Sequence, residues 1–128
     1  MNTDLAEQPV GTAPKYLEVR ALSAGKRISQ KQMLKELEGL NKAQTDGTIW
    51  RIETKWELFG LVSRLTHKNA KGAHSTDDSI EPGYYWTDEE TPWFEGGRVV
   101  VGFGFGLVGN DYVAYYRAFA RAVRVAGQ

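Results

Sequence analysis

The stretch T-I-W-R-I-E-T-K-W-E-L-F-G-L-V-S-R-L, residues 48–65, carries the pattern from which the fold is predicted. Apolar side chains recur in it at i, i+3, i+7 and i+10, the spacing of one buried face of an α-helix. Gly60 comes next, and glycine is common just beyond a helix C-terminus. We therefore predict a helix over residues 48–59 and a short strand over residues 61–65. The buried face of the helix would consist of Ile49, Ile52, Trp56 and Phe59.

The same stretch also allows an extended structure. Every second residue from Trp50 to Leu58 is apolar or threonine, which is typical of a half-buried strand that turns at Gly60. This alternation stops at Phe59, whereas the helical face includes Phe59, so the pattern favours the helix. The alternating residues are Trp50, Ile52, Thr54, Trp56 and Leu58.

Length and composition indicate one folded domain. The chain has 128 residues, of which 41% are hydrophobic, and it includes four tryptophans. It has no cysteine, which excludes disulfides and zinc–thiolate sites. No apolar run approaches the roughly 20 residues of a membrane span, and residues 1–13 lack the apolar core of a signal peptide. We expect a cytoplasmic protein with a flexible tail over residues 1–13.

The net charge is zero, but the charges are distributed in blocks. Residues 15–71 contain twelve basic and six acidic side chains, whereas residues 72–97 contain seven acidic and no Lys or Arg side chains. A basic block followed by an acidic one indicates that one surface meets an anion and another does not. Charges that mix on the folded surface are an equally good interpretation.

The clearest helix start in the chain is at Ser29. Ser29 and Gln32 have the spacing of a capping box, in which each side chain bonds a backbone N–H of the first turn. The helix is expected to end near Gly39, before a polar connection over residues 41–47. Residues 16–24, by contrast, fit a helix or a strand equally well. The buried stripe of the helix would be Met33, Leu34, Leu37 and Leu40.

This order of elements resembles winged helix-turn-helix regulators of the MarR and IclR type over about residues 16–90. The resemblance implies an α+β fold, with the winged domain over residues 14–91 and a C-terminal strand and helix over residues 92–128. Residues 67–72 would form the wing tip and residues 84–90 the returning strand. The connection between helices is longer than in those families, and the long wing becomes acidic. The residues that match the third helix and wing strand are Thr48, Ile49, Arg51, Gly60, Leu61, Val62 and Arg64.

The resemblance also implies duplex DNA binding, with the helix over residues 48–59 in the major groove, and hence a small transcriptional regulator. Arginine suits bidentate contact with guanine, and lysine suits contact with phosphates. Trp50 could stack on a base or sugar. The expected DNA-binding residues are Lys42, Thr48, Trp50, Arg51, Thr54, Lys55, Lys68 and Lys71.

A strand over residues 98–101 and a last helix that begins at Asn110 are expected near the C-terminus. Flanking helices commonly form the dimer contact in the families that this chain resembles, so a homodimer is expected. The interface would consist of Tyr112, Tyr116, Phe119 and Val123 on one face of the helix. The opposite stripe, Arg117, Arg121 and Arg124, would face solvent.

Other groups of residues are weaker indications of a cofactor, metal or catalytic site. Gly104-x-Gly-x-x-Gly109 fits a dinucleotide fingerprint, but the chain ends before the second strand that this motif needs. His67 and His74 lie near acidic residues, yet nothing in the spacing fixes a metal geometry. The sequence shows no nucleophile paired with a general base, so we expect neither enzymatic activity nor a cofactor. The alternative to DNA binding is a non-catalytic protein-binding module or inhibitor, because Tyr and Trp are common interface anchors.

Overall fold

The computed structural model describes residues 16–63, 67–91, 97–104, 111–114 and 117–126. It contains helices and antiparallel sheets, so the α+β class is confirmed. None of the described helices is long and apolar enough to cross a membrane. In chain order the elements are β1 (Glu18–Ala21), the 3-10 helix η2 (Leu22–Gly25), α2 (Gln30–Ala43), β2 (Ile49–Ile52), α3 (Lys55–Phe59), β3 (Tyr84–Glu90), β4 (Arg98–Gly102), β5 (Asp111–Ala114) and β6 (Arg121–Val125).

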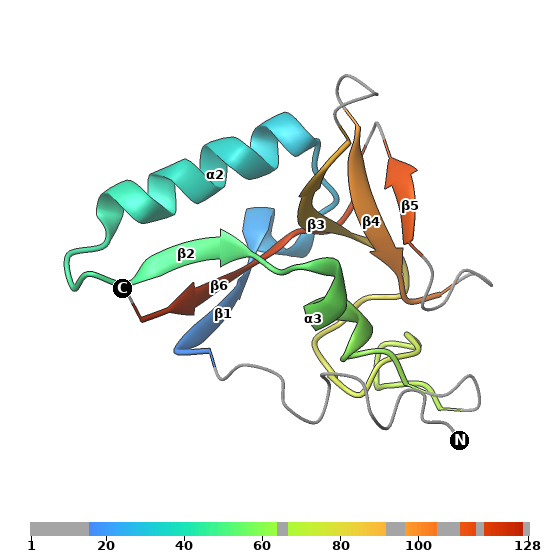
Figure 1. Ribbon diagram of the computed structural model, residues 1–128. Coiled ribbons are helices and arrows are strands. Elements are labelled where there is room, and N and C mark those ends of the chain that lie inside the picture. The colour runs from blue at the N-terminus through green and yellow to red at the C-terminus, as the bar shows by residue number, and fades with distance from the viewer. Residues whose placement is uncertain (1–15, 64–66, 92–96, 105–110, 115–116, 127–128) are drawn as a thin grey trace.

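The strands form two antiparallel sheets (Figure 1). Sheet 1 has the order β1-β6-β2, so the first and last described strands lie side by side. Sheet 2 has the order β3-β4-β5. Helix α2 runs along sheet 1, whereas the short helix α3 follows β2 and contacts β3 and β4. Sheet 1 therefore joins strands from both ends of the described chain to β2, whereas sheet 2 is built from the interior alone.

Two apolar clusters hold these layers together. The first includes Met33 of α2 and Trp50 of β2, and Trp86 of sheet 2 joins it. The Trp86 indole N–H donates to the carbonyl of Ile28 at 2.8 Å, which satisfies the polar atom of this buried ring. The second cluster packs α3 and the segment after it around Phe103. Trp86 therefore links the two sheets through the first cluster.

The helix that begins after Ser29 is confirmed. The Ser29 hydroxyl accepts the N–H of Gln32 at 3.1 Å, and Met33 is fully buried. The helix continues past Gly39 to Ala43, because a single glycine weakens a helix without ending it. The strands expected over residues 84–90 and 98–101 are also found, as β3 and β4.

The single helix expected over residues 48–59 is wrong. Residues 49–52 form β2, and the helix begins only at Lys55. The Thr54 hydroxyl accepts the N–H of Glu57 while the Glu57 carboxylate accepts the N–H of Thr54, so this capping box sets the helix start seven residues later than expected. The alternation of Trp50 and Ile52 correctly indicated a strand, since both side chains are buried.

The expected C-terminal helix is also wrong. Residues 111–114 form β5 and residues 121–125 form β6, each paired in an antiparallel sheet. Of the strand expected over residues 61–65, the described part contributes one isolated bridge, between Val62 and Ser75. The tail over residues 1–13, Gly106, Gly109 and Asn110 lie outside the described residues.

A candidate binding site around Trp50

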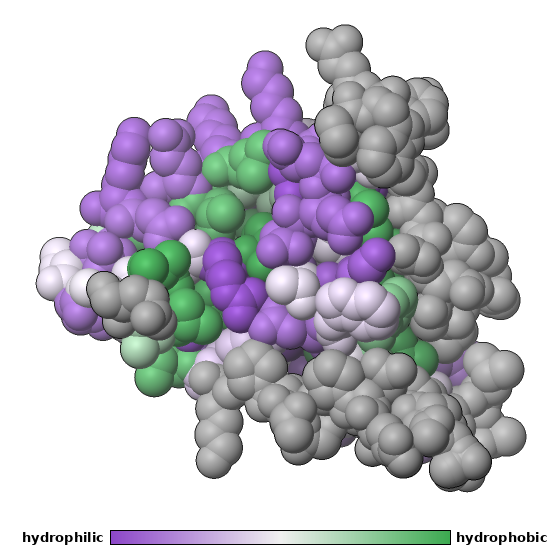
Figure 2. All heavy atoms as spheres, in the orientation of Figure 1, coloured by the Kyte–Doolittle hydropathy of each residue, from purple (hydrophilic) through white to green (hydrophobic). Residues whose placement is uncertain are grey.

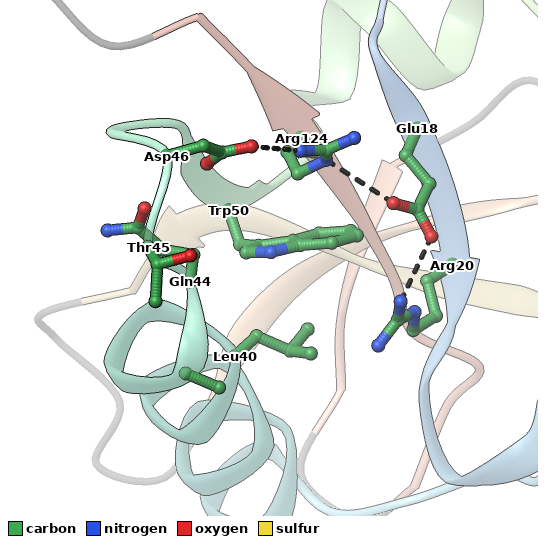
Figure 3. Close-up of a pocket in the computed structure, with 9 residues that line it drawn as sticks. Glu18, Arg20, Leu40, Gln44, Thr45, Asp46, Trp50 and Arg124 are labelled. Carbon is green, nitrogen blue, oxygen red and sulfur yellow. Dashed lines mark hydrogen bonds and ion pairs between the residues drawn. The ribbon is translucent and has the colours of Figure 1, made fainter.

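A hollow of about 320 Å³ lies where α2 ends beside sheet 1 (Figure 3). All three strands of sheet 1 contribute to it, together with the end of α2 and the connection that follows. Figure 3 shows the Trp50 ring between Leu40 on one side and Arg124 on the other. The lining residues are Glu18, Arg20, Leu40, Ala43, Gln44, Thr45, Asp46, Trp50 and Arg124.

The strand register explains why these side chains meet. Arg124 on the central strand β6 lies opposite Glu18 of β1 and opposite Trp50 of β2. Residues opposite one another in antiparallel strands point to the same face of the sheet. Arg20 lies two residues from Glu18 along β1 and therefore points to this face as well. One row of the sheet thus combines an acid, a cation and an aromatic ring.

The two arginines of the hollow lie over the Trp50 ring and are held there by carboxylates. The guanidinium carbons of Arg20 and Arg124 are 4.9 Å and 5.9 Å from the indole centroid, within the range of a cation–π contact. Arg124 pairs with Glu18 (Nε to Oε1, 3.3 Å) and with Asp46 (Nη1 to Oδ2, 2.8 Å). Arg20 Nη2 lies 3.0 Å from Glu18 Oε2. The four charges therefore balance.

Asp46 is also fixed by the start of β2. Its Oδ1 accepts the hydroxyl of Thr48 at 2.7 Å and the N–H of Thr48 at 3.1 Å. These hydrogen bonds, with a smaller contribution from Arg124, lower the pKa of Asp46 below its ordinary value of 3.8. Asp46 therefore stays ionised at neutral pH, and the hollow keeps both signs of charge.

Chemically, the hollow offers guanidinium donors and carboxylate acceptors above a largely buried aromatic ring. These are groups that bind and orient another molecule. Within the described ranges, no group of three or more His, Cys, Asp or Glu side chains is placed to hold a metal ion. His74 instead lies with its Nδ1 3.1 Å from the carbonyl of His67.

A second ionic cluster is buried beneath the surface and cross-links the fold. Glu53 Oε1 lies 2.5 Å from Arg121 Nε, and both side chains are less than a tenth exposed. Arg121 Nη1 also reaches Asp77 at 3.2 Å, and the Tyr16 hydroxyl donates to Glu53 at 3.0 Å. Burial raises the pKa of Glu53, and Arg121 opposes this change. Because the Arg121 side chain is buried against Glu53, the prediction that Arg121 faces solvent is wrong.

The residues expected to contact DNA are distributed over α2, β2, α3 and the segment after α3. Trp50 is 5% exposed, and Thr48 is buried beside Asp46. Thr54 caps α3, and Lys68 is exposed. The expectation that one helix presents most of these residues is therefore wrong. All eight of them lie within the part of the chain that the structure describes.

Four of the expected DNA-binding cations lie beside carboxylates. Both terminal nitrogens of Arg51 bond Glu57 at 2.7 Å. The remaining pairs are Lys42 with Glu38 at 3.7 Å, Lys55 with Glu89 at 3.6 Å and Lys71 with Glu81 at 3.4 Å. These pairs offset much of the positive charge that the sequence pattern assigned to one surface.

The expected dimer residues do not form one helical face. Val123 is fully buried in the central strand of sheet 1. Phe119 packs within the molecule against Tyr85, with ring centroids 5.2 Å apart. Tyr112 belongs to β5, and Tyr116 lies outside the described residues. The expected helical face has no counterpart in the described part of the fold, because Tyr112 lies in β5 and Val123 in β6.

Sequence reasoning missed Glu18, Arg20 and Asp46 as site residues and placed Arg124 on a solvated helix. The alternation of Trp50 with Ile52 was the available signal, because a strand there directs Trp50 towards α2. The chain matches no protein-family model, no curated protein and no solved structure. The candidate site therefore rests on its own geometry.

Proposed function

We propose that this protein is a protein-binding module that uses the hollow around Trp50 as its contact site. The observation that carries the proposal is the stacking of Arg20 and Arg124 on Trp50. Tryptophan and arginine are the residues that most often dominate the free energy of a protein interface. Here they are held in place in advance by Glu18 and Asp46, which lowers the entropy lost on binding.

The charges of the hollow define the kind of partner. Two arginines could pair with carboxylates of the partner, and the carboxylates of Glu18 and Asp46 could accept its N–H groups or pair with its cations. A polyanion such as a nucleic-acid backbone would gain little there, because the two acids offset the two arginines. A peptide segment that carries charges of both signs is therefore the proposed ligand.

Duplex DNA binding through residues 48–59, in a winged helix-turn-helix, is the alternative function. It has less support, because it depended on a single helix whose outer face presents free cations. Arg51 is instead bonded to Glu57, and Lys55 lies beside Glu89. The two functions predict different ligands and can be separated by experiment.

The test uses a random peptide library displayed on phage, selected on the wild-type protein. Selected peptides should bind at least about tenfold more weakly to Arg124→Gln, a change of roughly 1.4 kcal/mol. Arg117→Gln is the matched control, because Arg117 is an exposed arginine four residues before β6 and does not line the hollow. Circular dichroism verifies that both variants are folded.

Two results would count against the proposal. The first is a set of selected peptides that bind both variants as tightly as the wild type. The second is salt-dependent binding of a random duplex DNA, followed by fluorescence anisotropy, that weakens on Arg51→Ala. That outcome would favour the DNA-binding alternative.

A further inference from the structure

No strand of the described residues pairs with the outer edge of β1. The N–H of Leu22 donates to the carbonyl of Ala120 at 2.9 Å, and the register opposes Arg20 to Ala122. Hydrogen-bonded pairs alternate with non-bonded pairs along an antiparallel ladder, so Arg20, like Leu22, bonds to β6. The N–H and C=O groups of Val19 then point away from β6. Within the described part of the chain, no strand lies beyond β1 in sheet 1 (Figure 1).

The outer edge of β2, by contrast, is closed by side chains. The N–H of Trp50 donates to Asn41 Oδ1 at 2.8 Å, and Asn41 Nδ2 donates to the Trp50 carbonyl at 2.9 Å. The next outward carbonyl, that of Ile52, accepts from Arg51 Nη1 at 3.4 Å. The Asn41 amide thus takes the place of a neighbouring strand. Among the described residues, the edge of β1 is therefore the edge of sheet 1 that is left to accept another strand.

We infer that β1 pairs antiparallel with β1 of a second copy of this chain, with Val19 on the two-fold axis. In this register the outward groups of Val19 exchange two hydrogen bonds with those of the other Val19. Glu18 then lies opposite Arg20 of the second copy, and the same pair forms again across the axis. These are non-hydrogen-bonded positions, where opposing side chains lie closest.

Charge selects this register over its neighbours. Moving the two-fold axis by one residue in either direction would oppose Arg20 to its own copy or Glu18 to its own copy. Like charges directly opposite each other destabilise a strand pair, whereas opposite charges stabilise it. The sequence Glu18-Val19-Arg20 is therefore self-complementary when two copies run antiparallel.

The exposed apolar side chains on the other face of β1 support the same pairing. Leu17 is 56% exposed and Val19 is 43% exposed. Figure 2 shows hydrophobic surface over the end of the molecule where sheet 1 lies. Pairing brings these side chains of both copies together on one face and removes apolar area from water. Because the shared edge is short, the interface is smaller than a standard one, and the dimer should form in a concentration-dependent way.

Sedimentation velocity on the full chain, from about 1 μM to about 500 μM, tests the inference. The wild type should pass from a 14.3 kDa monomer to a species of twice that mass. Val19→Lys should stay monomeric, because two like charges would meet on the axis. Ile49→Lys is the matched control: Ile49 is 44% exposed on the other edge strand and should leave the dimer unchanged.

A charge-swap experiment tests the register. Glu18→Arg gives an edge with two positive charges, and Arg20→Glu gives one with two negative charges, so each variant alone should be monomeric. A mixture of the two should form a heterodimer, because every opposed pair is again of opposite sign. The inference does not depend on the proposed peptide ligand, and these measurements contain none.

Three results would overturn the inference. One is a wild type that remains a single 14.3 kDa species at the highest concentration. Another is a dimer that survives Val19→Lys as well as it survives Ile49→Lys. The third is a mixture of the Glu18→Arg and Arg20→Glu variants that stays monomeric, which would exclude this antiparallel register.

Discussion

The two edge strands of sheet 1 have the same local structure, but their outer edges differ in whether described side chains cover them. Both β1 and β2 are four-residue strands that pair with β6. The edge of β2 is closed by Asn41 from α2, whereas the edge of β1 meets no described element. The availability of a strand edge is thus decided by a side chain nine residues away in sequence, and the strand itself does not reveal it. An edge left open is a site of association unless it is protected.

The packing behind the closed edge should be the most sensitive to mutation. Trp50→Ala removes a ring that is 5% exposed and should lower the free energy of unfolding by about 3–5 kcal/mol. Trp56→Ala is the control, because Trp56 is 53% exposed and should cost less than about 1 kcal/mol. Urea denaturation measures both. Equal losses would contradict the burial of Trp50 at this edge.

Removing the side chain that closes the β2 edge should have the next largest effect. Asn41→Leu keeps a side chain of similar size but leaves the N–H and C=O of Trp50 without their partner, at a cost of about 1–3 kcal/mol. Lys42→Leu, on the exposed side of α2, should change stability by less than about 0.5 kcal/mol. Amide hydrogen exchange at Trp50 should accelerate only in Asn41→Leu. Unchanged exchange there would mean that Asn41 does not protect this edge.

Low pH should destabilise the β2 edge by protonating Glu57. The Glu57 carboxylate holds Arg51 beside the Ile52 carbonyl. Burial raises the pKa of Glu57, but the hydrogen bonds from Arg51 and from the Thr54 N–H outweigh it and lower the pKa below 4.5. A carboxylate whose folded pKa is lowered stabilises the fold above its unfolded pKa, and this stability is lost as the pH falls through the folded pKa.

Glu57→Gln should therefore cost about 1–2 kcal/mol at pH ~7 and lose less stability than the wild type below pH ~4.5. Urea denaturation at a series of pH values measures this difference. Glu38→Gln is the control, because its ion pair with Lys42 is exposed and contributes little. If the free energies of unfolding of Glu57→Gln and of the wild type fell in parallel as the pH is lowered, Glu57 would not be the group that makes this edge sensitive to acid.

The open edge should tolerate a change that a paired edge could not. Val19→Pro removes an N–H that points away from β6 and should cost less than about 1 kcal/mol in the monomer. Arg20→Pro removes an N–H that bonds to β6 and should cost clearly more. Thermal unfolding at low micromolar concentration compares the two. If Val19→Pro were the more damaging variant, the assignment of the outward groups of β1 would be reversed.

Local signals in the sequence determined some elements by themselves. Ser29 and Gln32 define the start of α2, because the groups that cap a helix are three residues apart and need no tertiary contact. Thr54 and Glu57 carry the same information for α3, and this capping box indicates that the helix starts at Lys55. The α+β class and the strands β3 and β4 also follow from local patterns.

Residues 48–59 fit both a helical and a strand periodicity, and tertiary structure decided which of the two they adopt. Ile49, Ile52, Trp56 and Phe59 satisfy a helical period, while Trp50 and Ile52 satisfy a strand period. The strand forms because β6 offers a complete ladder to residues 49–52 from more than sixty residues away. Intrinsic preferences of this size are routinely overridden by such non-local pairing.

The same reason explains the candidate site and the C-terminal segment. Arg121 and Arg124 have the spacing of a helical stripe, yet one is buried on Glu53 and the other lies over Trp50. Their partners are fixed by the strand order β1-β6-β2, which joins segments from both ends of the described chain. The sequence by itself determined which segments could become helices or strands. Only tertiary pairing decided which charges are neutralised and which edge stays open, because both depend on residues that are distant along the chain.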